Sequence, residues 1–296
     1  MIISKKVQNI KISSGNDGQR LDNFLLSKIK NMPKSHVYKL IRTGQVRINS
    51  SRSKPSSKLK IGDIIRIPPI ISSETLKPKI SKDIIAKTLK NILYEDENII
   101  VFNKPSSFAV HSGTKIGYGL IDIMREVKTN CERIDLLHRL DKDTSGCIII
   151  TKSLSSLRMF QEKIKKNKLE KKYICLVDGL WDKSINKSEI ELSRNNKKHN
   201  AISEFKIIKK YKNSTLLEVK IITGRYHQIR KHCALLNHAI IGDKKYCDKK
   251  INKIYKKLGL NRIFLHAFSI SFKTNYSKNI KCPIPSELDL FLKKHK

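Results

Sequence analysis

Acidic side chains and paired cysteines are both scarce in this chain of 296 residues. Asp and Glu number 26 against 62 Lys and Arg, which gives a formal net charge of +36. An excess this large goes beyond what solubility requires and indicates a polyanionic partner, with nucleic acid favoured over a membrane surface. The six cysteines are scattered and none forms a C-x-x-C pair. Their spacing argues against a zinc site or a disulfide framework, and it predicts a cytoplasmic protein with reduced thiols.

Long apolar runs are also missing. Residues 1–12 mix Lys with Ile and lack the continuous apolar segment of a signal peptide. Runs such as Cys147–Ile150 are far too short to cross a bilayer. We therefore expect no membrane partner.

The N-terminal part reads as a small unit of helices and strands. Residues 20–30 place apolar side chains on one helical face, and Pro33 opens a second helical pattern that Gly44 would end. The segments QVRIN and GDIIRIPP follow as strands on either side of a basic loop. This order resembles the S4 RNA-binding domain. Its candidate RNA contacts are Arg42, Arg47, Arg52 and Lys54.

The rest of the chain is a larger domain of mixed helices and strands. The boundaries we predict are a tail at 1–15, the S4-like domain at 16–75, a polar linker at 76–90 and a catalytic domain at 91–296. Residues 182–200 read as an exposed excursion with at most a short strand. The clearest strand patterns lie at 99–102, 147–151, 173–177, 204–208 and 216–222, and the clearest helical patterns at 120–127, 154–166 and 227–236.

The densest polar segment is LLHRLDKDTSG, which runs into the apolar strand CIIIT. A carboxylate such as Asp141, on a loop that enters a buried strand, is a typical catalytic placement, and it is equally a typical structural turn. The spacing of Asp141 and Asp143 also imitates aspartate phosphotransferases. In those proteins the strand precedes the motif, whereas here it follows, so phosphotransfer is the weaker interpretation.

A second segment, TGRYHQIRKHC, places Arg225 and Arg230 at the junction of a strand and a helix. The spacing of five between His227 and His232 suits a shared metal poorly. An arginine can pair bidentately with a carboxylate and remain charged when buried, so one of these could hold Asp141. Tyr173, in a third segment, is a strand-edge residue, a platform that stacks on a base, or a phenol that moves a proton.

Together these segments resemble the large-subunit family of pseudouridine synthases. The resemblance is carried by YEDENIIVFNKPSSFAVHSG, HRLDKDTSG, KKYICLVDG and TGRYHQIRKH, and it spans roughly residues 92–272 behind the S4-like unit. It implies an α+β fold with a mixed, mainly antiparallel sheet. The implied activity is isomerisation of specific uridines, at three sites, to pseudouridine in 23S ribosomal RNA or its precursor. No cofactor and no metal is implied, and nothing in the sequence demands more than a monomer.

The resemblance also assigns residues. Asp141 becomes the catalytic aspartate, Arg230 its partner, and Tyr173 the ring that packs on uracil and helps to remove the C5 proton. Arg139 would enter the RNA stack in place of the target base, with His138, His111 and Arg225 as further RNA contacts. The carboxylate route stays open among attack at C1′, addition to the base and deprotonation of the sugar. The alternatives are a synthase for another RNA site and a catalytically silent ribosome-assembly factor.

Overall fold

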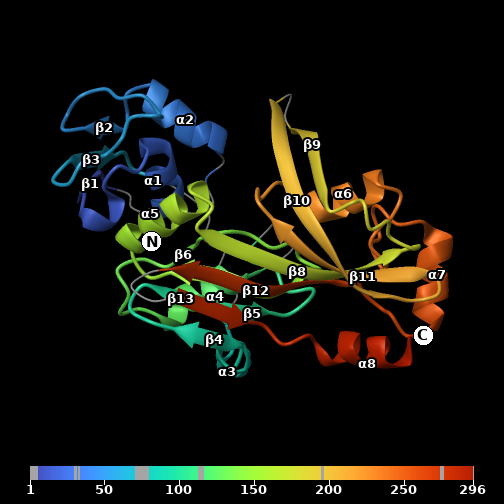
Figure 1. The fold of residues 1–296 in the computed structure, drawn as a ribbon. Coiled ribbons are helices and arrows are strands. Elements are labelled where there is room, and N and C mark those ends of the chain that lie inside the picture. Colours follow the sequence, from blue (N-terminus) through green and yellow to red (C-terminus); the bar gives the residue numbers. More distant parts are fainter. Residues whose placement is uncertain are drawn as a thin grey trace. The chain divides into compact units, whose positions relative to one another are not determined.

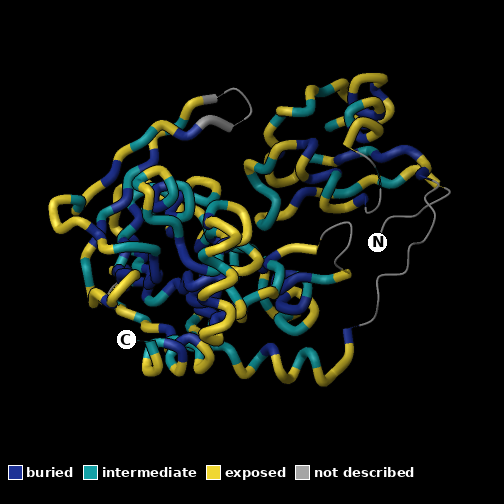
Figure 2. Tube along the Cα trace, turned by 90° about the vertical axis from the view of Figure 1, so that its right-hand side faces the viewer, coloured by how far each residue is buried: buried dark blue, intermediate teal, exposed yellow. Residues whose placement is uncertain are grey.

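The computed structural model describes residues 6–29, 32, 34–70, 80–112, 117–194, 197–273 and 277–295. The chain divides into two compact units, Met1–Lys79 and Ile80–Lys296. Each unit has its own set of buried residues (dark blue in Figure 2). None of the helices in the described ranges is both long and apolar enough to span a bilayer.

The first unit packs two short helices against a three-stranded antiparallel sheet (Figure 1). Its core is formed by apolar side chains of the helices, including Leu21, Phe24 and Val37, with Ile65 and Ile67 from the sheet. The expected helices and strands of the S4-like unit are present, although Pro33 lies outside the described residues. The elements are β1 (Gln8–Lys11), η1 (Ser14–Asn16), α1 (Leu21–Lys28), α2 (Lys34–Arg42), β2 (Arg47–Ile48) and β3 (Ile64–Ile67), with sheet order β1-β3-β2.

The segments expected to be a tail and a linker contain regular structure. Within residues 1–15, β1 pairs with β3 from Gln8↔Ile67 to Lys11↔Ile64, so the first unit begins before residue 16. Within residues 76–90, the Ser81 hydroxyl accepts a bond from Ile84 N and starts helix α3 (Lys82–Leu89). Both elements are short and half exposed. Their apolar residues are therefore too few to show the periodicity by which a strand or a helix is recognised in a sequence.

The second unit is built on a ten-stranded sheet with the path β4-β5-β7-β12-β8-β11-β10-β9, to which β13 and β6 are added at β12 and β7. Among its described pairings, only β7 with β12 is parallel. Its strands are β4 (Ile92–Glu95), β5 (Ile99–Lys104), β6 (Asp135–Leu136), β7 (Ser145–Thr151), β8 (Leu169–Asp178), β9 (Lys187–Arg194), β10 (Lys197–Lys210), β11 (Ser214–Ile221), β12 (Leu265–Lys273) and β13 (Ser277–Lys281).

Helices cover both faces of this sheet because its central strands are apolar on both sides. On β7, Ile148 and Ile150 join the cluster that holds α4 (Leu120–Val127) and α6 (Gln228–Leu235). Cys147 and Ile149 face the opposite way, toward α5 (Leu154–Lys165). Further along that second face of β8 lie α7 (Lys249–Lys257) and α8 (Ser286–Lys294). The mainly antiparallel α+β class predicted from the sequence is confirmed.

Residues 182–200 lie mostly exposed, as predicted, but the expectation of at most a short strand was wrong. β9 and β10 form a long antiparallel hairpin that extends from the sheet (Figure 1), with register from Lys187↔Glu204 to Arg194↔Lys197. Its outer half has few apolar neighbours to bury, and the sequence KSEIELSR is therefore rich in charge. Backbone pairing with β10 supports this strand along its length, and such pairing leaves little trace in hydropathy, although Ser188 and Leu192 are buried.

Candidate active site

Asp141 lies on the loop between β6 and β7, in a turn closed by a bond from Thr144 N to Asp141 O of 3.1 Å. The loop enters β7 at Gly146, whose φ is +115°. A Cβ there would stand 2.2 Å from the carbonyl oxygen of Ala267 on β12, so only glycine allows the two strands to approach. The close strand contact thereby fixes where the Asp141 loop ends.

Lys104, at the end of β5, ties a second loop to this turn. Its side chain is fully buried, and Nζ donates to the carbonyl oxygens of Pro105 at 2.8 Å, Phe108 at 2.9 Å and Lys142 at 2.9 Å. Burial lowers the pKa of Lys104 to about 7, against the opposing charges of Asp143 and Asp141. The three carbonyls take up all three N–H groups of the ammonium form. Sequence reasoning missed this residue, since its role depends on contact with a loop 38 residues away.

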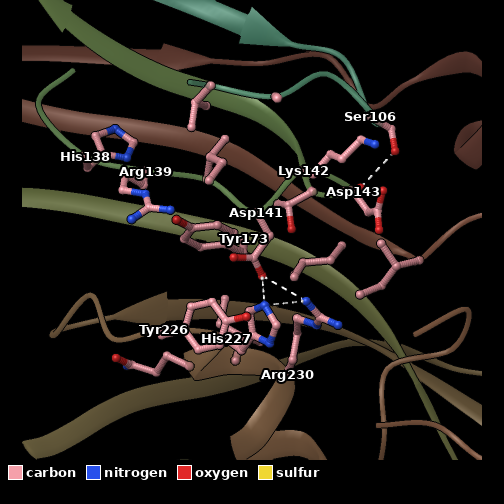
Figure 3. Close-up of a pocket in the computed structure, with 18 of the residues that line it drawn as sticks. Ser106, His138, Arg139, Asp141, Lys142, Asp143, Tyr173, Tyr226, His227 and Arg230 are labelled. Carbon is pink, nitrogen blue, oxygen red and sulfur yellow. Dashed lines mark hydrogen bonds and ion pairs between the residues drawn. The ribbon is translucent and has the colours of Figure 1, made fainter. Parts of the chain in front are cut away.

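Arg230 projects from α6 toward Asp141, as Figure 3 shows. Its Nη1 donates to Asp141 Oδ2 at 3.1 Å, and the two side chains are 13% and 26% exposed. The pair therefore sits at the wall of a cavity with the carboxylate still accessible. This contact joins two segments that are 89 residues apart in sequence.

Asp243, which sequence reasoning did not single out, holds the other side of the Arg230 guanidinium. Arg230 Nε donates to one of its oxygens at 2.7 Å and Nη2 to the other at 2.8 Å, a bidentate pair with a fully buried carboxylate. Burial alone would lower the pKa of Arg230, but the bonds and charge of Asp243, with Asp141, raise it above its ordinary value. Arg230 is thus locked in its charged form with one nitrogen left for Asp141.

His227 also contacts Arg230 Nη1, the nitrogen that donates to Asp141. It occupies the left-handed region with φ of 54° at the start of α6, and its Nε2 lies 3.0 Å from Arg230 Nη1. Since arginine only donates, Nε2 must accept, which leaves the ring proton on Nδ1, 3.0 Å from Tyr246 Oη. Burial is the main cause that lowers the pKa of His227, and Asp141 opposes it. The neutral ring helps to hold Arg230 beside Asp141.

Tyr173 on β8 lies on the other side of Asp141 (Figure 3). Burial raises the pKa of its phenol, and the nearby Asp141 charge raises it further. The phenol therefore keeps its proton at neutral pH and offers a flat apolar ring to the cavity.

These side chains line one cleft of about 1290 Å³ in the second unit. Arg139 and His111 are exposed at it, and the described residues give the Arg139 guanidinium no hydrogen bond or ion pair. Arg225 is also exposed, with Nε donating to Asn200 O at 3.2 Å. His138 differs, because its Nε2 accepts from Ile149 N at 3.2 Å and burial lowers its pKa to about 3. Its ring is neutral and forms part of the cleft wall.

Comparison with known proteins decides the family. A family model described as RNA pseudouridylate synthase matches residues 98–235, and an S4 domain model matches residues 19–65. The chain is 41% identical over 286 residues to ribosomal large subunit pseudouridine synthase C of Haemophilus influenzae, covering 92% of this chain and 89% of that protein. The protein of the same name from Buchnera aphidicola subsp. Baizongia pistaciae is 41% identical over 292 residues and 93% of each chain. The chain belongs to the RNA pseudouridylate synthase family.

Membership confirms the resemblance that the motifs indicated and makes the chain an enzyme. The solved structure of human RNA pseudouridylate synthase domain containing 4 has the same catalytic fold, with a TM-score of 0.61 at 23% identity, over 72% of this chain and 95% of that one. In the described parts of this pseudouridine synthase, no group of three or more His, Cys, Asp or Glu side chains is arranged to hold a metal ion.

The remaining predicted contacts lie in the S4 unit of the enzyme. Arg42, Arg47, Arg52 and Lys54 are all exposed. Arg47 bonds locally to the carbonyls of Gly44 at 3.2 Å and Ser50 at 3.1 Å. The Arg52 side chain crosses Gly44, where a Cβ would be 2.7 Å from Arg52 Nε. The unit thus presents a basic face around α2 and β2.

Proposed function

We propose that this enzyme isomerises uridines of 23S ribosomal RNA to pseudouridine, with Asp141 as the catalytic carboxylate. The observation that carries the proposal is the Asp141–Arg230 pair of 3.1 Å within the cleft, with Tyr173 beside it. The relatives named above act on large-subunit ribosomal RNA by their names. The S4 unit and the net charge of +36 suit the same kind of polyanion.

The reaction breaks the N1–C1′ bond, turns the uracil and joins C5 to C1′. Positive charge develops at C1′ as the bond breaks, and a carboxylate can stabilise or trap it, as in glycoside hydrolysis. Asp141 is accessible and is oriented by Arg230, so it suits attack at C1′, the route we favour over addition to the base and deprotonation of the sugar. A cleft wall that excludes water keeps the detached base in place.

Tyr173 serves as the surface on which uracil packs while it turns. A base that removes the C5 proton would need a phenolate, yet burial and Asp141 favour the phenol. We therefore assign the ring to packing and orientation rather than to proton removal. Tyr173→Phe should keep most of the turnover, whereas Tyr173→Ala should lose it together with the ring surface.

Arg139 is the residue we assign to the gap that the target base leaves. Flipping a uridine out of a stack costs roughly a few kcal/mol, and a side chain that fills the gap offsets part of that cost. Arg139 is exposed at the cleft and has no hydrogen bond or ion pair to the described residues, so nothing has to break before it enters RNA. His111 and Arg225 would hold phosphates at the rim.

We infer further that the enzyme acts as a monomer at three sites, with RNA affinity supplied by the exposed basic residues of the S4 unit. The domain division that we propose places RNA capture in the unit Met1–Lys79 and chemistry in the unit Ile80–Lys296. Base identity is read in the cleft, because phosphate contacts fix position and carry little sequence information.

The test is tritium release from unmodified 23S ribosomal RNA labelled at uridine C5. Wild type should release tritium without added metal, and Asp141→Asn should release none while binding the RNA with unchanged affinity. Mapping the modified positions in the product then counts the sites. Tight binding by both proteins without release by either would contradict the proposal and favour a silent assembly factor.

A further inference from the structure

Lys171 on β8 is a buried cation that the arrangement around Asp141 does not use. Its side chain lines the cleft, the residue is 7% exposed, and the described residues give its Nζ no hydrogen bond or ion pair. Its neighbour Lys172 faces the other way and pairs with Glu218 at 3.2 Å and Glu170 at 3.8 Å. Two adjacent lysines therefore differ in whether the protein supplies a counter-charge.

The Lys171 ammonium faces Gly224 across the cleft wall. A Cβ built on Gly224 would stand 3.8 Å from Nζ, and apart from Gly224 and its two chain neighbours no other heavy atom lies within 4 Å of that point. Tyr173, two residues along β8, lines the same cleft, since alternate residues of a strand share a face. Lys171 Nζ thus borders the same cleft as the Tyr173 ring, on which we propose that uracil packs.

The Lys171 ammonium lies at the cleft wall, where partial desolvation is not repaid by an opposite charge from the described residues. Burial lowers the pKa of Lys171 to about 8, which still leaves most of the population charged at neutral pH. Lysine is a strongly hydrated point charge, so a ligand oxygen that replaces its lost water would stabilise it in this cleft. The ligand atom that suits it is an oxygen carrying full or developing negative charge.

We propose that Lys171 binds an anionic oxygen of the target nucleotide in the cleft. That oxygen is either on a phosphodiester next to the flipped uridine or on the uracil itself. When the N1–C1′ bond breaks toward an oxocarbenium at C1′, its electron pair stays on uracil and is shared by the two carbonyl oxygens. The uracil anion then forms the C5–C1′ bond, the C5 proton passes to water, and N1 takes up a proton from water, so that the atoms and the charge balance. A positioned ammonium stabilises that charge while it exists.

The inference rests on the proposed function, and Lys171→Met tests it with Lys172→Met as the matched control. Both variants remove one lysine from the same strand, so the change in overall charge is identical. On tritium-labelled RNA that the wild type modifies, Lys171→Met should lose at least about tenfold in kcat/KM. Lys172→Met should stay within about twofold, and Lys171→Arg should recover part of the loss.

The source of the oxygen follows from a second measurement. Short RNAs are compared that carry either uridine or an abasic ribose at one modified position. Equal loss of affinity of Lys171→Met for both RNAs identifies a phosphate, whereas unchanged affinity with a lower kcat identifies uracil. Gly224→Ala, which brings a methyl group into contact with Nζ, should weaken the same parameter. It tests the proposal independently should Lys171→Met not fold.

Wild-type values of kcat and KM for Lys171→Met would overturn the inference, because a buried amine without a ligand would then be a feature of packing alone. The proposed function would stand in that case, since the wild type still releases tritium and Asp141→Asn does not. Absence of release by the wild type would instead remove the proposed function.

Discussion

Two groups of cations, one in each unit of this enzyme, differ in how the protein holds them. In the S4 unit, Arg42 and Lys54 extend into solvent, and neither pairs with a carboxylate of the described residues. In the catalytic unit, Arg230 is 13% exposed and is held by Asp243 before any RNA arrives. Exposed cations adapt to phosphates wherever the backbone runs, whereas a catalytic cation must be in place at the moment of reaction.

The difference shows why net charge alone says little about function. The net charge of +36 indicates a polyanionic partner. Phosphate contacts carry little sequence information, so an exposed Lys or Arg at one position can serve RNA affinity as well as one at another. The arginine beside Asp141 is different, because three of its nitrogens have assigned partners. Substitutions can break the hydrogen bonds of Arg230, or they can measure how differently the cations of the two units contribute to rate and to RNA affinity.

Arg230→Lys should have the largest effect. A lysine keeps the charge but has one nitrogen, which cannot bond both oxygens of Asp243 and also reach Asp141. We expect kcat to fall by about 10² to 10³ while RNA affinity changes by less than about twofold. Single-turnover tritium release and filter binding on the same RNA measure the two quantities. A lysine variant with wild-type kcat would show that charge, and not the planar fork, is what Asp141 needs.

Much of the fold was predictable because its patterns are local. Residues 120–127 carry a strong apolar stripe and form α4 with the predicted bounds, and the apolar run that follows Gly146 is β7. The β9–β10 hairpin, in contrast, is stabilised by backbone pairing across polar segments. Hydropathy does not record such pairing, so the sequence alone could not show it.

The candidate site residues could be predicted only where they belong to motifs that the pseudouridine synthases share. Asp141, Tyr173 and Arg230 were predicted as site residues mainly through a resemblance, and the fold brings Arg230 on α6 to Asp141 on the loop before β7. Asp243 and Lys104 carried no comparable signal. The bidentate pair of Asp243 with Arg230, and the bonds of Lys104 to carbonyl oxygens, depend on contacts between segments far apart in the sequence. The one available clue was a charged residue at the end of the apolar strand pattern at 99–102, where Lys104 lies.

Asp243→Asn should have the next largest effect. The amide keeps the shape of the carboxylate but offers one acceptor and no charge, so Arg230 loses the partner that fixes its direction. We expect kcat to fall by about 10-fold to 100-fold with RNA affinity unchanged. The buried guanidinium would also lose a counter-charge, and the free energy of unfolding should drop by about 3 kcal/mol.

Asp289→Asn is the matched control, since it removes a carboxylate paired with Lys293 on the exposed side of α8. It should leave kcat unchanged and alter stability by less than about 0.5 kcal/mol. If Asp243→Asn also kept the wild-type kcat, Asp141 and His227 would suffice to orient Arg230.

The S4 unit should respond in affinity and not in rate. The double change Arg42→Ala and Lys54→Ala should weaken RNA binding by about 3-fold to 10-fold, leaving kcat intact at saturating RNA. The slope of log Kd against log salt should fall by about 0.9 for each phosphate that the protein no longer neutralises. Lys293→Ala, which removes a lysine already paired with Asp289, should change neither. An equal slope for all three proteins would remove the S4 face from the binding surface.

The smallest effect concerns the stability of the S4 unit itself. Buried Asp22 accepts from Arg20 at 2.7 Å and from Tyr38 Oη at 2.7 Å, and these bonds, led by Arg20, lower its pKa to about 2. A depressed carboxyl pKa stabilises the folded state at neutral pH, and this contribution is lost as the pH falls from about 4 toward 2. Tyr38→Phe should therefore cost about 1 kcal/mol at pH 7 and less near pH 2.

Hydrogen exchange of α1 and α2 amides in the full chain would measure this change locally. Fluorescence of Trp181, the single tryptophan and a buried residue of the second unit, serves as the internal control. Faster exchange in the first unit with an unchanged Trp181 transition would show that the units lose stability separately. A shifted Trp181 transition would instead mean that the second unit depends on the first, and the division between RNA capture and chemistry would then be one of role and not of folding.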